Sequence, residues 1–332
     1  MADQLAPTSA APAPSEPLLR AVGLTRHFQV GGMLAKQNLH AVDDVDLTVN
    51  DREIVALVGE SGSGKSTIAR LLARIYKPTA GEIHYRGRSL SSLRSRRDLL
   101  WYRGEVPMVF QDPFSAFNPV HRISHGIMRN LALHRPELSR GERRAEAERV
   151  SESVGLSARM LDRFPHEMSG GERQRIGFAQ ALAMQPRLIL ADEPVSMLDV
   201  SIRAGILNLM AKLRDSEDVS LLYITHDLAS ARYVADRIVV MYAGQIAESG
   251  PTETVLSQPK HPYTRLLLSA VVDPRDAEAE FSADTGEPPR VINPGEGCRF
   301  RWRCPFAVAA CKTITPLPRA APPRASNRGL RC

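Results

Sequence analysis

Short runs of consecutive apolar residues mark the strands that the sequence predicts. Residues 54–58, 188–191 and 221–225 are continuous apolar stretches. A strand that is buried on both faces of a parallel sheet has this pattern. Residues 41–47 predict a further strand, and residues 239–248 predict a hairpin that turns at Gly244. The pattern therefore predicts an α/β fold.

Apolar residues at helical spacing predict an amphipathic helix over residues 66–76. Pro78 and Gly81 are expected to end this helix. Four apolar residues fall on one face of it: Ile68, Leu71, Leu72 and Ile75. The predicted order is then strand, glycine-rich loop and helix, which is the structural context of a phosphate-binding loop.

Composition divides the chain into three parts. Residues 1–17 are rich in Ala and Pro and lack a basic start and an apolar stretch, which predicts a disordered tail and no secretory signal. Residues 18–260 carry the α/β pattern. A charged stretch at about 112–180 interrupts this pattern and predicts a helical subdomain. Periodicity fades from residue 261, so residues 261–332 are expected to form a small C-terminal module.

The net charge of +6 over 332 residues does not change this division of the chain. The basic residues are scattered and few aromatic residues lie among them, so no nucleic-acid partner is expected. No apolar run is long enough to span a bilayer. These features predict a cytoplasmic protein that contacts a membrane through partner chains.

The strongest chemical signal is the glycine-rich loop after residues 54–58. Glycines let several backbone N–H groups face one phosphate, and the following helix adds its positive end. Lys65 is expected to contact the β- and γ-phosphates, and the Ser66 hydroxyl to ligate Mg²⁺. The nucleotide-binding residues are predicted to be Gly59, Glu60, Ser61, Gly62, Ser63, Gly64, Lys65, Ser66 and Thr67.

Two carboxylates, Asp192 and Glu193, follow the apolar run 188–191. The carboxyl end of a parallel strand faces the nucleotide crevice in such folds. Asp192 is expected to hold Mg²⁺, and Glu193 to orient or deprotonate the attacking water. The alternative is a solvated acidic turn, which the nearby phosphate-binding loop disfavours.

A second glycine motif comprises Ser169, Gly170, Gly171 and Glu172, and it precedes a predicted helix. One interpretation is an ordinary capped helix start. The other is that the open amides receive an anion from outside the chain, namely the γ-phosphate of a nucleotide held by a second chain.

Together these motifs resemble those of the ATP-binding-cassette ATPases over about residues 18–270. The resemblance implies a P-loop ATPase core with a helical insertion. It also implies a dimer in which the Ser169 motif of one chain closes over the ATP of the other. Met168 and Glu172 replace the commoner Leu and Gln of the family's signature, while the Ser-Gly-Gly core is intact.

The resemblance implies four further site residues. Phe28 would stack on adenine, and Gln111 would contact Mg²⁺ and lead to the membrane partner. Asp199 would lie in the loop that crosses between the two ATPases. His226 would contact the γ-phosphate and join Lys65, Gln111 and Glu193 in catalysis.

The C-terminal module narrows the resemblance to the ATPases of oligopeptide, dipeptide and nickel importers. Residues 261–264, 297–300 and 303–305 carry its motifs, and residues 286–289 are similar to the family's linker. The four cysteines are Cys298, Cys304, Cys311 and Cys332. Four thiolates suit a [4Fe–4S] cluster or a tetrahedral zinc ion, and free thiols are an equally good interpretation of the residues alone. The resemblance favours the cluster.

The sequence therefore predicts an ATP-hydrolysing motor on the cytoplasmic face of a membrane, with ATP and Mg²⁺. The expected partners are a second identical or similar ATPase, two permease subunits and an extracytoplasmic binding protein. Oligopeptides or dipeptides are the expected cargo, with nickel chelates or oligosaccharides as alternatives. A non-catalytic ATP-binding partner subunit is the rival hypothesis, which the intact Lys65, Asp192 and Glu193 disfavour.

Overall fold

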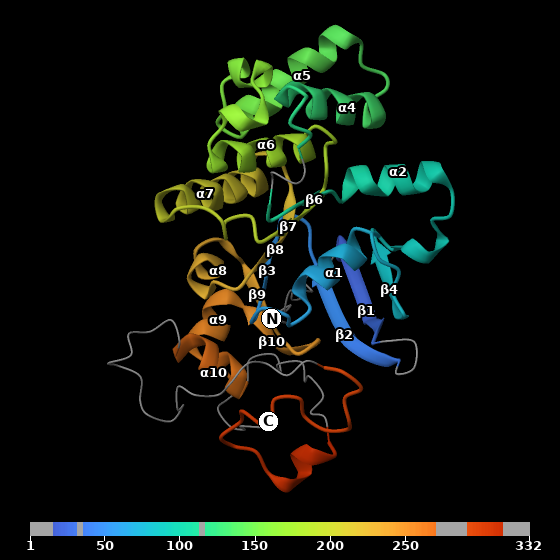
Figure 1. The fold of residues 1–332 in the computed structure, drawn as a ribbon, viewed down its shortest axis with the longest axis vertical. Coiled ribbons are helices and arrows are strands. Elements are labelled where there is room, and N and C mark those ends of the chain that lie inside the picture. Colours follow the sequence, from blue (N-terminus) through green and yellow to red (C-terminus); the bar gives the residue numbers. More distant parts are fainter. Residues whose placement is uncertain (1–15, 32–35, 113–116, 270–290, 315–332) are drawn as a thin grey trace, which may run out of the picture.

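The computed structural model describes residues 16–31, 36–112, 117–269 and 291–314. Nearly all of the predicted tail at residues 1–17 lies outside these ranges, as does Cys332. Figure 1 shows an elongated molecule with a helical part at one end, two sheets in the middle and the C-terminal segment at the other end.

A six-stranded sheet forms the centre of the chain, and its strands are parallel except for β10. This confirms the α/β fold, the buried strands and the hairpin that turns at Gly244. The strands, in spatial order, are β10 (Gln245–Pro251), β9 (Arg237–Tyr242), β3 (Ile54–Val58), β8 (Ser220–Thr225), β7 (Leu188–Asp192) and β6 (Met108–Val109).

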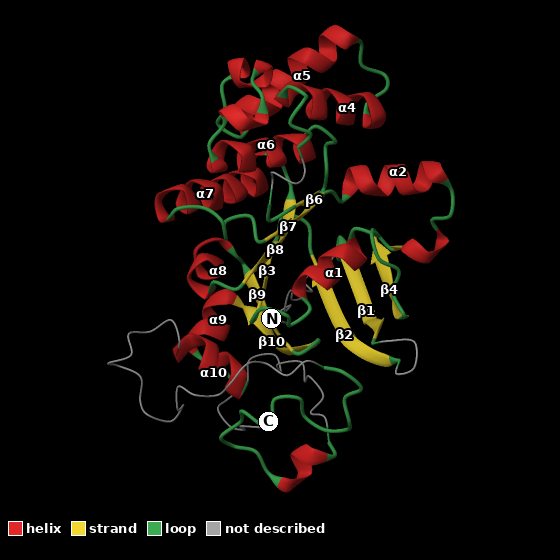
Figure 2. Cartoon of the chain, viewed as in Figure 1, coloured by secondary structure: helices red, strands yellow, loops and turns green. Residues whose placement is uncertain are grey.

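A second, antiparallel sheet packs beside the first, as Figure 2 shows. Its spatial order is β2 (Gln37–Val49), β1 (Leu19–Val30), β4 (Ala80–Tyr85) and β5 (Arg88–Ser89). The strand predicted at residues 41–47 is the central part of β2.

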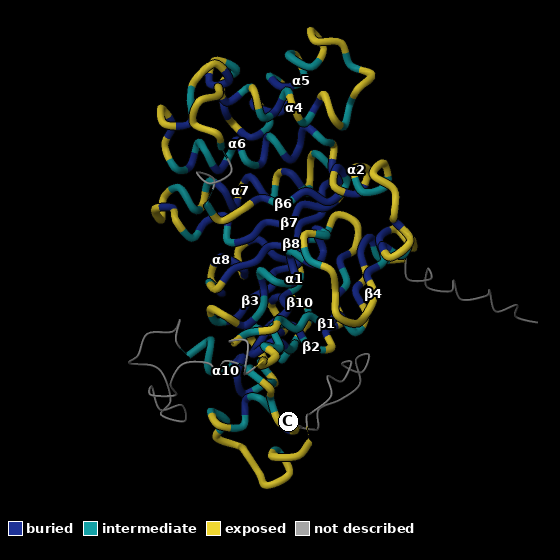
Figure 3. The backbone as a smooth tube through the Cα atoms, turned by 45° about the vertical axis from the view of Figure 1, so that its right-hand side comes forward, coloured by how far each residue is buried: buried dark blue, intermediate teal, exposed yellow. Residues whose placement is uncertain are grey.

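The two faces of the parallel sheet bury two separate hydrophobic cores. Alternate residues of β3 divide between them: Ile54, Ala56 and Val58 face one core, and Val55 and Leu57 face the other. The sheet strands are correspondingly dark in Figure 3. The first core is shared with the helical part and the second with α1 (Lys65–Leu72) and the antiparallel sheet.

Helix α1 is shorter than the helix predicted over residues 66–76. It ends at Leu72, and Arg74 has a left-handed backbone with φ of 54°. The Arg74 guanidinium donates to the carbonyl oxygens of Leu90 (2.7 Å) and Leu93 (3.0 Å). Ile75 is 52% exposed, so it does not continue the apolar face. The expected ending at Pro78 and Gly81 was therefore wrong, because the helix stops where Arg74 turns toward these carbonyls.

The predicted helical insertion is present at the end of the molecule away from the C-terminal segment (Figure 1). It is built on α4 (Ile123–His134), α5 (Arg140–Ser153) and α6 (Gly170–Leu182), with short 3₁₀ turns at Ala158–Asp162 and Pro165–Glu167. The remaining helices are α2 (Arg96–Glu105), α7 (Val200–Ser216), α8 (Leu228–Val234), α9 (Thr252–Ser257) and α10 (Pro262–Ser269), with 3₁₀ turns at Leu90–Ser92 and Ala309–Lys312.

The C-terminal segment packs directly on the two sheets. Leu39 of β2 forms a bridge with Ile292. Tyr263 of α10 is fully buried and Phe300 is 2% exposed, and both belong to the core of the parallel sheet. The segment is therefore part of the same folded body.

Candidate functional site

The loop between β3 and α1 is shaped by glycines at positions that admit no side chain. A Cβ built on Gly59 would lie 2.1 Å from the Met241 carbonyl oxygen, and one built on Gly64 would lie 2.2 Å from that of Ala41. A Cβ built on Gly62, which has φ of 77°, would meet no atom of the described residues within 4 Å. The loop is thus pressed against β2 and β9 on one side and open on the other.

The open side of this loop offers unpartnered donors. Gly64 caps α1 without a side-chain hydrogen bond, so the first amides of the helix are available to a ligand. A triphosphate would satisfy these donors, so the residues fit the predicted ligand.

Lys65 lies among backbone carbonyls and carboxylates. Its ammonium donates to the carbonyl oxygens of Gly59 (2.7 Å) and Glu60 (2.9 Å). Burial lowers the pKa of Lys65, and the charges of Glu193, Asp192 and Glu60 oppose that shift. A phosphate group would replace the carbonyl contacts with stronger charge-assisted ones.

Ser66 and Asp192 form the pair that suits a magnesium ion. The Ser66 hydroxyl donates to Asp192 Oδ1 at 2.9 Å. Burial raises the pKa of Asp192, and the hydrogen bond from Ser66 partly offsets this. Hydroxyl and carboxylate oxygens are the donors that Mg²⁺ takes from P-loop proteins. The donor set therefore fits the predicted ion.

Glu193 lies where the ends of three parallel strands meet. Gln111 follows β6 and donates its side-chain amide to Glu193 Oε2 at 3.3 Å. His226 follows β8, and its Nδ1 lies 3.4 Å from the same oxygen. The structure thus brings together the predicted catalytic residues Lys65, Gln111, Glu193 and His226.

The backbone of Glu193 is in the left-handed region, with φ of 47°, and its N–H donates to the Ile224 carbonyl at 3.0 Å. A non-glycine residue in this region is strained, and such strain is found at functional sites. The bond to β8 helps to hold the Glu193 carboxylate at the sheet edge.

Ser169 caps α6 within its own chain. Its hydroxyl accepts the Glu172 N–H at 3.3 Å and donates to the Glu172 carboxylate at 2.8 Å. Figure 1 places α6 in the helical part, apart from α1. The chain therefore does not bring Ser169 to its own phosphate-binding loop, as the two-chain interpretation requires.

The glycines beside Ser169 have a packing role that the sequence did not reveal. A Cβ on Gly171 would lie 2.5 Å from Ile202 Cγ2, and one on Gly170 would lie 3.3 Å from Leu198 Cδ2. Asp199 begins α7 next to these residues, and its carbonyl accepts the N–H groups of Ile202 and Arg203. The signature and the predicted crossing loop thus form one packed unit.

Phe28 lies on β1, where its ring meets Tyr76 edge to face at 5.4 Å and Arg26 lies over it at 4.5 Å. Its role as the adenine platform stays a prediction. His27, on the same strand, stacks on His40, and both contact Asp43.

The described cysteines lie in the C-terminal segment. The Cys298 N–H donates to the Cys311 carbonyl at 2.9 Å, and Cys298 and Cys304 pack against the main core. In the described ranges, three potential metal ligands lie within 4.8 Å of one another at His27, His40 and Asp43, and not at the cysteines. A closed zinc site would place its sulfurs about 3.8 Å apart. Cys298, Cys304 and Cys311 do not have that arrangement.

Sequence reasoning missed Tyr263 and Arg303 as neighbours of the phosphate-binding loop. The Glu60 N–H donates to Tyr263 Oη at 2.9 Å, and Arg303 forms two hydrogen bonds with the Glu60 carboxylate. Tyr263 lies in residues 261–264 and Arg303 in residues 303–305, and in the sequence these stretches indicate only a family resemblance.

Comparisons with known proteins agree with this geometry. Residues 42–196 match the family described as ABC transporter, and residues 247–311 match the one described as the C-terminal region of oligopeptide/dipeptide transporters. The chain is 43% identical over 308 residues to the probable peptide ABC transporter ATP-binding protein y4tS of Sinorhizobium fredii, covering 91% of this chain and 86% of the relative. It is 43% identical over 305 residues to the dipeptide transport ATP-binding protein DppF of Haemophilus influenzae, covering 90% and 92%.

Among solved structures, the dimeric post-hydrolysis state of the ATP-binding cassette MJ0796, bound to ADP and Pi, is similar with a TM-score of 0.63 and 27% identity. The match covers 70% of this chain and 98% of that one. The fold and the site define an ATPase of the ATP-binding-cassette class. Within that class, the chain belongs to the family of ATP-binding subunits of oligopeptide and dipeptide ABC transporters. In the described ranges, every helix is too short or too polar to cross a membrane.

Proposed function

We propose that this chain is the ATP-hydrolysing motor of a peptide importer. The observation that carries the proposal is the meeting of Gln111, Glu193 and His226 beside Lys65 and Asp192 at one sheet edge. The C-terminal region supports the assignment to peptides, since y4tS and DppF are named as peptide and dipeptide transport proteins. Nickel chelates and oligosaccharides remain the alternative cargoes.

Binding of ATP would use the open side of the glycine loop. The amides of Gly62, Gly64, Lys65 and Ser66 would face the phosphates, and Lys65 would exchange its carbonyl partners for β- and γ-oxygens. Ser66, Asp192 and Gln111 would hold Mg²⁺, which supplies charge neutralisation on the β- and γ-phosphates when bound.

Hydrolysis would proceed by in-line attack of water on the γ-phosphorus. Glu193 accepts a hydrogen bond from the water and draws its proton, while Gln111 and His226 fix the orientation of the carboxylate. Lys65 stabilises the charge that develops on the γ-phosphoryl oxygens. The bond from the γ-phosphorus to the β,γ-bridging oxygen breaks, and ADP leaves with inorganic phosphate as the second product.

Closure of the site would require a second chain, either identical or similar. Ser169 caps α6, and Figure 1 shows α6 in the helical part, apart from α1. Met197 and Val200, which flank Leu198 and Asp199, are 66% and 79% exposed. An exposed apolar pair beside the signature unit favours burial against another ATPase. The dimeric form in which MJ0796 was solved supports the same arrangement.

The helical part would connect the motor to two permease subunits. A cavity of about 300 Å³ lies between β6, α4 and α6, with Phe110, Phe117 and Met184 in its lining. Gln111 follows Phe110 directly and donates to the Glu193 carboxylate, so a segment seated in this cavity would act on that carboxylate through Gln111. We place the motor on the cytoplasmic face of the membrane, where an extracytoplasmic binding protein supplies the cargo to the permease.

Glu193→Gln tests the catalytic assignment. The variant keeps the shape of the side chain but loses the base, so it should bind ATP with wild-type affinity and lose about 10²–10⁴-fold in turnover. Turnover is measured by phosphate release, and dimer formation with ATP by light scattering. Wild-type turnover in this variant rules out the role of Glu193. A wild-type chain that binds ATP without turnover in the presence of its permease supports the non-catalytic alternative.

The three described cysteines and Cys332 are further proposed to hold a [4Fe–4S] cluster. The proposal rests on the number of cysteines and on the family resemblance, and the Cys298–Cys311 backbone bond brings two of them together. A cluster spreads its thiolates farther apart than a single ion does. Anaerobically purified protein should be brown and contain equal amounts of iron and sulfide. Colourless protein with one zinc per chain contradicts the proposal.

A further inference from the structure

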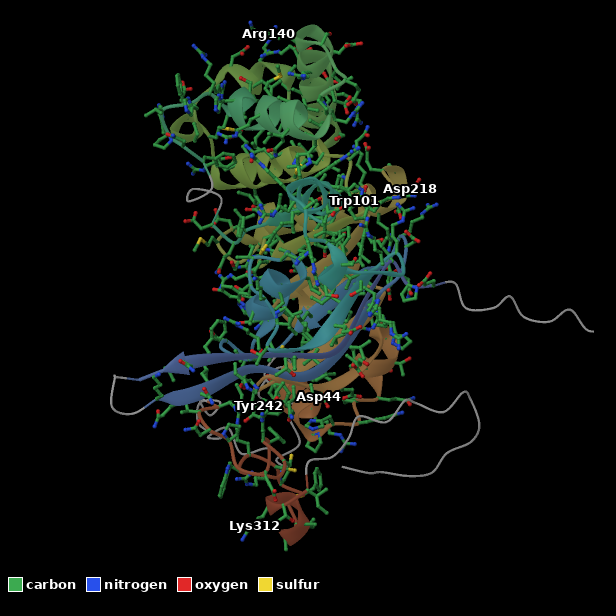
Figure 4. All side chains as sticks on the ribbon, turned by 90° about the vertical axis from the view of Figure 1, so that its right-hand side faces the viewer. Asp44, Trp101, Arg140, Asp218, Tyr242 and Lys312 are labelled. Atoms are coloured by element: carbon green, nitrogen blue, oxygen red, sulfur yellow. The ribbon has the colours of Figure 1, made fainter. Side chains whose placement is uncertain are left out.

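The C-terminal segment contacts the phosphate-binding loop directly at Glu60. Arg303 donates from both terminal nitrogens to the Glu60 carboxylate, at 2.8 and 2.9 Å. Tyr263 Oη accepts the Glu60 N–H at 2.9 Å. Figure 4 labels Tyr242 at the junction between the sheet and the C-terminal segment, and Lys312 at the far end of that segment.

These contacts are anchored in the core. Phe300 is 2% exposed, and its ring lies 5.2 Å from that of Tyr242 and 5.6 Å from that of Tyr263. Arg303 is 9% exposed in its side chain, and Glu60 is 24% exposed. A bidentate pair this well shielded from water is far stronger than a surface ion pair.

Glu60 carries a charge that opposes triphosphate binding. Glu60 is a residue of the loop itself, and its charge opposes the lowering of the Lys65 pKa by burial, after those of Glu193 and Asp192. Without Arg303, the Glu60 carboxylate would repel the anionic ligand. The two hydrogen bonds neutralise the charge and turn the carboxylate toward the C-terminal segment.

The backbone of Glu60 is fixed at the same time. Its carbonyl accepts from Lys65 Nζ and from the Ser63 N–H at 3.2 Å, while its own N–H is bound by Tyr263. The peptide groups of Glu60 therefore connect Tyr263 to the lysine that contacts the phosphates.

A second contact reaches the other side of the loop. Arg299 donates to the Ala243 carbonyl at 2.6 Å and binds Asp43. The next residue, Gly244, donates its N–H to the Ser63 carbonyl at 2.9 Å. The C-terminal segment thus braces the loop from two directions.

We infer that Arg303 and Tyr263 are positioning residues for ATP binding, acting through Glu60 on the phosphate-binding loop. This inference rests on the proposed function, since it assumes that the loop binds ATP. Neither residue contacts the reacting atoms. Their effect is on affinity for the triphosphate, and the catalytic step at Glu193 is unaffected.

The test measures ATP affinity and steady-state kinetics of the full-length chain. Arg303→Ala should raise Kd and KM for ATP about tenfold, because a charged pair is lost and a carboxylate is left facing the phosphates. Tyr263→Phe keeps the ring packing and should raise both about threefold. kcat should stay within about twofold in each variant. Arg303→Lys restores the charge without the two-pronged contact and should give an intermediate Kd.

Two controls separate positioning from general stability. Arg232→Ala removes an Arg–Glu pair that is also two-pronged but is exposed, at 62% and 68%, and should leave Kd unchanged. Glu60→Gln removes the charge that Arg303 neutralises. In that background, Arg303→Ala should change Kd by about twofold or less, since coupled residues do not act additively.

Several outcomes overturn the inference. One is wild-type Kd in both Arg303→Ala and Tyr263→Phe. Another is a tenfold effect of Arg303→Ala that persists in the Glu60→Gln background. If Arg303→Ala lowers the melting temperature and folds poorly, Tyr263→Phe and Arg303→Lys decide the question. A wild-type chain that fails to bind ATP overturns this inference and the proposed function together, whereas the Glu193→Gln result bears on the proposed function alone.

Discussion

At the scale of single residues, the buried carboxyl of Asp192 affects the stability of the nucleotide site. It is 5% exposed and bonded to Ser66, and burial raises its pKa. Folding therefore favours the protonated form of this carboxyl. Its favourable contribution to stability is fully present below the unfolded-state pKa and is lost as the pH rises through the folded-state pKa. At neutral pH the nucleotide-free protein holds a buried charge that a bound cation would neutralise.

Asp192→Asn should therefore stabilise the nucleotide-free protein while abolishing turnover. The amide keeps an acceptor for Ser66 and removes the buried charge, so the melting temperature should rise by about 2–4 °C at pH 7. The gain should shrink as the pH falls toward the ordinary range of an aspartate. Thermal unfolding measures it, and the exposed Asp51→Asn serves as the control. A lower melting temperature in Asp192→Asn shows that its charge stabilises the empty site.

At the scale of residues, the sequence predicted the site residues that belong to short motifs. Lys65, Ser66, Asp192 and Glu193 occupy fixed places in motifs, and the structure brings them together. It did not predict that Arg303 would bind Glu60, because the two residues are 243 positions apart. No local pattern encodes a contact that depends on how the C-terminal segment packs.

At the scale of elements, the start of α6 shows one sequence feature with two physical causes. Gly170 and Gly171 leave the helix amides open, but Gly171 also lies where any side chain would meet Ile202 of α7. The sequence suggested the first cause only. Packing against α7 fixes the signature beside Asp199, so a movement of either helix carries the other.

Gly171→Ala should therefore destabilise the fold in addition to impairing activity. A Cβ 2.5 Å from Ile202 Cγ2 forces α6 and α7 apart, and the free energy of unfolding should fall by about 1–3 kcal/mol. Gly141→Ala in α5 is the matched control, since its added methyl meets nothing within 4 Å. The control should be neutral or stabilising by up to about 1 kcal/mol. Urea unfolding compares the two, and equal values contradict the packing role.

The elements themselves were largely predictable. Continuous apolar runs identified β3, β7 and β8, because burial on both sheet faces leaves polar residues mainly at the strand ends. The end of α1 was not predictable from periodicity, since Ile75 continues the apolar pattern. That helix is stopped by bonds from Arg74 to a distant turn.

At the scale of the whole molecule, tertiary contacts set the order of the strands. The proposed pairing with a second ATPase chain depends on contacts between chains. The parallel sheet places β3 between β8 and β9, an order that no run of residues states. Likewise, in the proposed two-chain arrangement each ATP site would depend on Ser169 of a second polypeptide.

Mixing two inactive variants tests this dependence. Lys65→Ala lacks the phosphate-binding lysine, and Ser169→Ala lacks the closing serine. In a mixed homodimer one site has both residues intact, so an equimolar mixture should recover about a quarter of wild-type turnover. Each variant alone is the control. No recovery, at concentrations where light scattering shows dimers, contradicts a site shared between two copies of this chain.

The contacts of Arg303 and Tyr263 with Glu60 also bear on when the loop can bind ATP during synthesis. Glu60 leaves the ribosome 243 residues before Arg303, so the glycine loop emerges long before the arginine that completes it. A nascent or prematurely terminated chain carries the loop with its carboxylate unneutralised. By the inference above, a chain that stops before Arg303 should bind ATP more weakly than the full-length chain.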